Sequence, residues 1–145
     1  MRRSALPLLT VALLTGCGGT PPSLADLRRD AGRICTRTNR AVAKVSPPSS
    51  SAPSTRFLTA GIARLEVELR QLSRLTPSSD VAPVYRAGLK ALADELSALR
   101  AAARAIRRGE DPAIAFRTLQ RRLAPLESQA ANAWEALQIP ACVSA

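Results

Sequence analysis

Four stretches of this 145-residue chain carry apolar residues every third or fourth position, which places them on one face of a helix. The stretches span about 23–45, 55–75, 81–108 and 112–137. They are separated by helix-stopping segments: the Pro/Ser-rich residues 46–54, Thr76-Pro77 and Gly109. No stretch shows the alternation of a β-strand. The sequence therefore predicts an all-α fold, an antiparallel four-helix bundle.

Local signals support these boundaries and mark two special positions inside the helices. Ser23 with Asp26 three residues later forms a capping box, and Asp111-Pro112 supplies a cap and a first-turn proline. Gly61 falls on the apolar side of the second helix, where we expect it to permit close helix contact. Pro125 lies inside the fourth helix and is expected to bend it.

A short apolar segment precedes the first helix and has the organisation of an export signal. Arg2 and Arg3 come before a predominantly apolar segment, residues 5–14, which is too short for a membrane-spanning helix of ~20 residues. The segment ends in Leu14-Thr15-Gly16-Cys17. This motif resembles the lipobox of bacterial lipoproteins. The alternative is an ordinary secretory signal whose cleavage site happens to end in Gly-Cys.

The lipoprotein resemblance implies how the chain is processed and where it resides. Cleavage would fall after Gly16, dividing the chain into a signal peptide (1–16), a tether (17–22) and a helical domain (23–145). Cys17 would carry a lipid with acyl chains such as palmitate. This lipid would anchor the chain to the outer face of the cell membrane. Two acyl chains hold a protein stably on a bilayer, whereas one holds it marginally. The short tether would keep the domain close to the headgroups.

Lipidation of Cys17 leaves Cys35 and Cys142 as the remaining cysteines. An even pair in an exported protein predicts a disulfide. In an up-down bundle the first helix starts and the last helix ends at the same pole, so the C-terminal tail reaches Cys35 by folding back. A bridge that closes a loop of about 100 residues stabilises by up to ~4.7 kcal/mol in the loop-entropy model.

The chain is basic, with a formal net charge of +10 that falls to +8 once Arg2 and Arg3 are removed. One face of the first helix carries a basic stripe of Arg29, Arg33, Arg37, Arg40 and Lys44. We expect either a solvated face or a surface for polyanions such as lipid headgroups or wall polymers. Arginine and alanine are also abundant throughout, as in proteins from GC-rich genomes. Nucleic acid is not expected as a partner, because the chain is exported and has four aromatic residues.

Nothing in the sequence points to catalysis. The chain has no histidine, no CxxC pair and no phosphate-binding glycine loop. Glu66, Glu68, Asp94 and Glu95 are not predicted to form facing pairs, and Glu66 and Asp94 are expected in exposed salt bridges. We therefore expect a non-enzyme without metal or cofactor.

The helical domain as a whole resembles small helical lipoproteins of GC-rich Gram-positive bacteria. The similarity rests on loosely spaced features, which are Ile34-Cys35, Asn39, the Pro/Ser linker, Leu72, Leu75, Pro77, Tyr85 and Cys142. Those proteins are largely uncharacterised, so the resemblance implies a fold and a location and no activity.

Two hypotheses about function follow. In the preferred one, the chain is an envelope-anchored interaction or structural module that contacts a protein or an anionic polymer through a helical face. In the other, it carries a lipid or another hydrophobic molecule in a pocket floored by Tyr85, Phe116 and Trp134. The alternative role for these aromatics is ordinary core packing. A cavity between the second, third and fourth helices would distinguish the two hypotheses.

Overall fold

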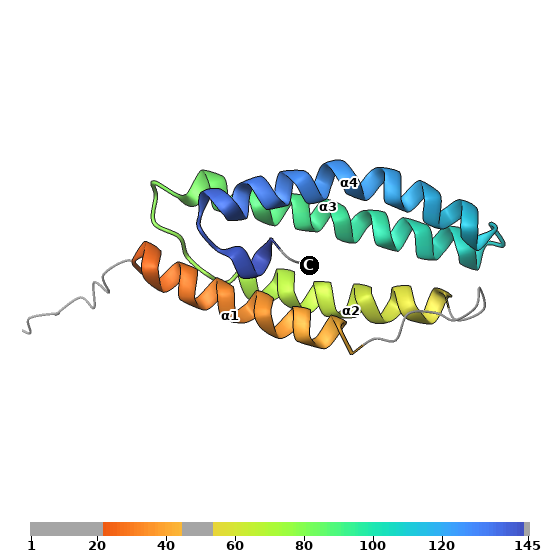
Figure 1. Ribbon diagram of the computed structural model, residues 1–145, viewed down its shortest axis with the longest axis horizontal. Helices are drawn as coiled ribbons and strands as arrows, with labels where there is room; N and C mark the ends of the chain where they lie inside the picture. Colours follow the sequence, from red (N-terminus) through yellow and green to blue (C-terminus); the bar gives the residue numbers. More distant parts are fainter. Residues whose placement is uncertain (1–21, 45–53, 144–145) are drawn as a thin grey trace, which may run out of the picture.

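The structure is a computed structural model that describes residues 22–44 and 54–143 (Figure 1). Its elements are α1 (Leu24–Val42), α2 (Ser54–Leu72), α3 (Ala82–Arg107), α4 (Pro112–Ala136) and a short 3-10 helix, η1 (Pro140–Cys142). No strand occurs among the described residues. The all-α prediction is confirmed, and each predicted helix boundary lies within three residues of the observed one.

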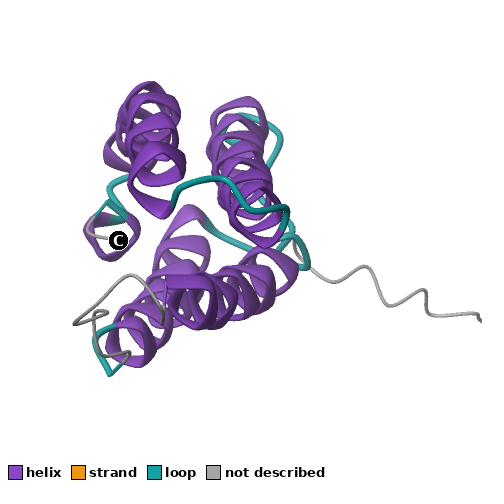
Figure 2. Cartoon of the chain, turned by 90° about the vertical axis from the view of Figure 1, so that its right-hand side faces the viewer, coloured by secondary structure: helices purple, strands orange, loops and turns teal. Residues whose placement is uncertain are grey.

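Successive helices run in opposite directions, so that α1 begins at the pole where α4 ends (Figure 1). Viewed along the bundle, α3 and α4 form one pair and α1 and α2 the other (Figure 2). The C-terminal η1 folds back onto α1 and also contacts α4. The structure is therefore an antiparallel bundle with η1 occupying part of the space between its first and last helices.

The Ser23–Asp26 capping box and the Asp111 cap are both present. The Ser23 side chain accepts from the backbone N–H of Asp26, and the Asp26 carboxylate accepts from that of Ser23. Asp111 accepts from the backbone N–H groups of Ala113 and Ile114. Gly109, with φ +93°, adopts the left-handed conformation that ends α3. These local interactions explain why the helix boundaries were readable from the sequence.

The disulfide predicted between Cys35 and Cys142 is present, with a Cα–Cα distance of 5.1 Å. Both cysteines are buried, and they join η1 to the middle of α1. Two further bonds hold the same segment. Asn39 Nδ2 donates to the carbonyl oxygen of Ala141 at 2.9 Å, and Arg28 Nε donates to that of Leu137 at 2.8 Å. The C-terminal tail is thus attached to α1 at three points.

The core of the described residues consists of two apolar clusters. The first combines α1, η1 and parts of the other three helices around Tyr85, Trp134 and the disulfide. The second lies among α2, α3 and α4, with Leu58, Ala103 and Leu119 as members, and contains no residue of α1. The bundle therefore has four helices at the disulfide end and three at the other.

Trp134 packs closely on the backbone of α3 at Gly88. A Cβ atom at Gly88 would lie 2.8 Å from the ring of Trp134, whereas one at Gly61 would have no atom within 4 Å. The expectation that Gly61 permits a close helix contact is wrong, and Gly88 has that role. Pro125 is exposed, and α4 continues through it as one helix.

Candidate functional site

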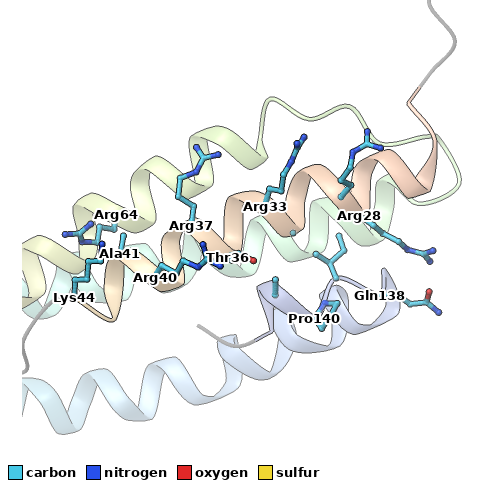
Figure 3. Close-up of a pocket in the computed structure, with 14 residues that line it drawn as sticks. Arg28, Arg33, Thr36, Arg37, Arg40, Ala41, Lys44, Arg64, Gln138 and Pro140 are labelled. Carbon is cyan, nitrogen blue, oxygen red and sulfur yellow. The ribbon is translucent and has the colours of Figure 1, made fainter.

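A basic groove of about 900 Å³ runs along α1 and is the candidate functional site (Figure 3). Its floor and one side are α1, with Gly32, Thr36 and Ala41 between the charged side chains. Gln138, Ile139, Pro140 and Ala141 form the opposite wall. Seven cations line it, and no acidic residue does: Arg28, Arg29, Arg33, Arg37, Arg40, Lys44 and Arg64.

The structure places all five residues of the predicted basic stripe in this groove. The groove has two features that the stripe alone did not reveal. Arg28 and Arg64 add charge from outside the stripe, the latter from α2. The residues from Gln138 to Ala141 convert a convex helix face into a concave site. Predicting these two features from the sequence would have required knowing which face of α2 packs against α1 and where the C-terminal tail folds.

Charge neutralisation differs between the two ends of the groove. Near the start of α1, Asp26 pairs with Arg29, and Asp30 pairs with Arg29 and Arg33. Asp26 has its pKa held below the usual value by hydrogen bonds from Ser23 and Arg29.

At the other end, Arg37, Arg40, Lys44 and Arg64 form no ion pair with any residue that the structure describes. All eleven acidic side chains of the sequence belong to those residues. We call these four residues the unpaired cations. Positive charge without internal compensation is therefore concentrated where α1 ends.

The disulfide determines the concave shape of the groove. Ile139 is buried, and Pro140 and Ala141 follow it directly before Cys142. Gln138 adopts φ 56°, a left-handed turn that directs the chain from α4 towards α1. The predicted disulfide thus positions one wall of the site as well as stabilising the fold.

A second, smaller cavity of about 370 Å³ opens between α1 and α2. We call it the interhelical cleft. Its walls include Ala41 on α1 and Ala60, Ala63 and Val67 on α2. Arg37, Ala41 and Arg64 line both the cleft and the groove, so the two cavities adjoin.

Two carboxyl groups inside the bundle have strongly raised pKa values. Burial raises the pKa of Glu68 to about 7, against a hydrogen bond with Thr38 that lowers it, and the charge of Glu95 raises it further. Burial and the charge of Glu127 raise the pKa of Glu95 to about 7 as well. The spacing of Glu68 and Glu95 in the sequence does not predict that they are neighbours, but the two interact across α2 and α3. Neither lines the groove or the interhelical cleft.

The other two acidic residues singled out in the sequence are at the surface, as expected. Glu66 pairs with Arg100 at 2.6 Å, and Asp94 pairs with Lys90 at 2.6 Å. The first pair connects α2 to α3, and the second connects neighbouring turns of α3.

The three aromatics proposed for a ligand pocket do not come together. Tyr85 and Trp134 are buried in the first cluster with their rings edge to face, 5.7 Å between centroids. Tyr85 Oη donates to the carbonyl oxygen of Leu72 at 2.8 Å, which ties the start of α3 to the end of α2. Phe116 packs against the second cluster. All three lie outside the two cavities at α1.

Cys17 and the rest of the lipobox lie outside the described residues, as does most of the linker 46–54. Within the described ranges, no group of histidine, cysteine or acidic side chains is arranged to hold a metal ion. None of the helices described is long and apolar enough to cross a membrane. Comparison with protein-family models, curated proteins and solved structures gave no match to this chain.

Proposed function

We propose that this chain is a lipid-anchored protein of the cell envelope that binds an anionic ligand through the basic groove and catalyses no reaction itself. The observation that carries the proposal is the charge of the groove, which has seven cations and no acid among its lining residues. Five of these cations form no ion pair with the described residues: Arg28, which donates a hydrogen bond to the carbonyl oxygen of Leu137, and the four unpaired cations. Holding like charges together costs free energy, and an anionic ligand in the groove recovers it.

The anchor belongs to the same proposal and rests on the motif Leu14-Thr15-Gly16-Cys17. A lipid on Cys17 would attach the chain a few residues before α1, so the paired end of the groove would lie nearest the bilayer. Screening limits charge interactions to ~8 Å at physiological salt. If α1 stands upright, the unpaired cations face ligands beyond the headgroups. If α1 lies flat on the membrane, cations along the whole groove contact the headgroups.

The experiment that tests the groove measures binding of mature chain carrying Cys17→Ser. Sedimentation with vesicles, with and without phosphatidylglycerol, and titration with soluble polyphosphate are performed at low and high salt. In the test variant, Arg37, Arg40, Lys44 and Arg64 become Gln. In the matched control, the exposed residues Arg104, Arg107, Arg117 and Arg121 become Gln, which removes the same net charge.

We expect salt-sensitive binding to at least one probe. Each cation near an anionic surface contributes ~1 kcal/mol, so the test variant should lose roughly 100-fold or more in affinity. The affinity of the control variant should fall by less than about tenfold. Equal losses in both variants would mean that binding follows net charge alone, and the groove would have no special role.

A separate fractionation tests the anchor. The Cys17→Ala protein should leave the membrane fraction or retain its signal peptide, because the acyl acceptor is gone. A variant that stays on the membrane with normal processing would contradict the lipoprotein assignment and leave the groove proposal standing.

A further inference from the structure

The interhelical cleft adds an apolar compartment to the basic groove. Ala41, Ala60, Ala63 and Val67 form much of its wall, and Val67 is one of the few large apolar side chains exposed in the described structure, at 41%. Arg37 and Arg64 lie where the cleft meets the groove. A ligand at this junction contacts charge at one end and hydrocarbon at the other.

The described residues do not satisfy all the hydrogen-bonding groups of Arg64. Its Nε is buried and has no hydrogen-bond partner, and the same holds for Glu68 Oε2 one turn further along α2. These are the two buried side-chain polar atoms without a partner in the described part of the chain. A buried donor without an acceptor costs folding free energy. An anionic oxygen at the mouth of the cleft would bind the part of the Arg64 side chain that lines both cavities.

We propose that the groove and cleft together bind an anionic lipid with a single acyl chain. Arg37 and Arg64 hold its phosphate headgroup, and the acyl chain occupies the cleft between α1 and α2. A hydrocarbon chain needs no hydrogen-bond partners from the alanines and valine there, whereas a peptide backbone would. The cleft volume of about 370 Å³ is near the lower end of the ~300–1,000 Å³ typical of ligand pockets, so the cleft has room for no more than one acyl chain.

This proposal rests on the proposed function, because the headgroup uses cations of the same groove. The experiment is calorimetric titration of mature Cys17→Ser chain below the micelle concentration of each lipid. Three probes separate the contributions: oleoyl lysophosphatidic acid has both parts, glycerol 3-phosphate has only the head, and monoolein has only the chain. We expect lysophosphatidic acid to bind at least tenfold tighter than either. Tenfold corresponds to ~1.4 kcal/mol, which burial of about two methylene groups provides.

A variant that fills the cleft tests where the acyl chain lies. Ala63→Phe places a ring in the cleft, and Ala87→Phe places one on α3 away from both cavities. Both alanines are exposed, so neither change disturbs the core. Ala63→Phe should abolish the preference for lysophosphatidic acid over glycerol 3-phosphate, and Ala87→Phe should retain it.

The outcomes distinguish this proposal from the one on which it rests. Retention of the acyl preference in Ala63→Phe, or equal binding of monoolein and lysophosphatidic acid, overturns the lipid proposal. Salt-sensitive polyphosphate binding without any acyl preference also overturns it and leaves the groove function intact. Absence of binding to every anionic probe overturns both.

Discussion

At the scale of single residues, Glu68 shows what the sequence pattern does not reveal. The residue directly follows the exposed Val67 of α2, yet it is 4% exposed and contacts Thr38 of α1. Periodicity assigns a residue to a face of its own helix, but the neighbouring helix decides whether that face is covered. Burial of a carboxyl group favours its neutral form, which gives Glu68 its raised pKa.

This burial predicts a pH dependence of stability. The pKa of Glu68 is raised from 4.5 to about 7 in the folded chain. The contribution of neutral Glu68 to the free energy of unfolding is therefore complete below about pH 4.5. It is lost as the pH rises through about 7. Glu68→Gln keeps the shape and stays neutral, so it should raise the free energy of unfolding by about 1–3 kcal/mol at pH 8. At pH 4 the change should be small.

Urea unfolding at both pH values measures this difference. Glu135→Gln, at an exposed position, is the matched control and should have little effect at either pH. An equal change in unfolding free energy at pH 4 and pH 8 for Glu68→Gln would show that titration of Glu68 does not influence stability.

The glycines provide a second prediction at this scale. Gly88→Ala brings a Cβ within 2.8 Å of the buried Trp134 ring, so it should destabilise by about 1–3 kcal/mol despite the better helix propensity of alanine. Gly61→Ala meets no neighbouring atom and should stabilise by up to ~1 kcal/mol. Thermal unfolding of the two variants measures both effects. A stabilised Gly88→Ala protein would contradict the close packing of Trp134 on α3.

At the scale of elements, the helices were predictable and the C-terminal wall was only partly so. Caps, prolines and apolar spacing act within a few residues, which is why Ser23, Gly109 and Asp111 mark helix ends correctly. The disulfide followed from the cysteine count and the bundle topology. The groove wall did not follow, because η1 is too short to show periodicity, and its position depends on Cys35, Asn39 and Arg28 of a distant helix.

The disulfide should therefore affect binding as well as stability. Replacing Cys35 and Cys142 with Ser should cost about 2–5 kcal/mol of stability. It should also weaken polyphosphate binding several-fold, because residues 138–141 are no longer held against α1. Leu119→Ala removes a buried side chain of the second cluster and costs a similar ~2–5 kcal/mol without touching η1. The polyphosphate affinities of the two variants are compared well below their unfolding temperatures, so that both proteins are folded.

If Leu119→Ala weakens binding as much as loss of the disulfide, the effect comes from stability alone. If neither variant changes affinity, α1 forms the anion site without the C-terminal wall.

At the scale of the whole molecule, the two apolar clusters divide the bundle unequally. The first cluster has the disulfide, Trp134 and Tyr85, and it receives α1 and η1 in addition to the other helices. The second cluster has three alanines and two leucines as its buried members. Stabilisation by apolar burial scales with the area removed from water, so the second cluster contributes less. The groove and the interhelical cleft are both lined by α1, which packs on the first cluster.

This division predicts unequal local stability along a single helix. In α3, amides near Leu92 belong to the first cluster and those near Ala103 to the second. Native-state hydrogen exchange should be roughly tenfold or more faster near Ala103, because the three-helix end opens without unfolding the disulfide end. Leu119→Ala should accelerate exchange near Ala103 further and leave the amides near Leu92 almost unchanged. Uniform protection along α3 from Tyr85 to Ile106 would show instead that the bundle opens as one unit.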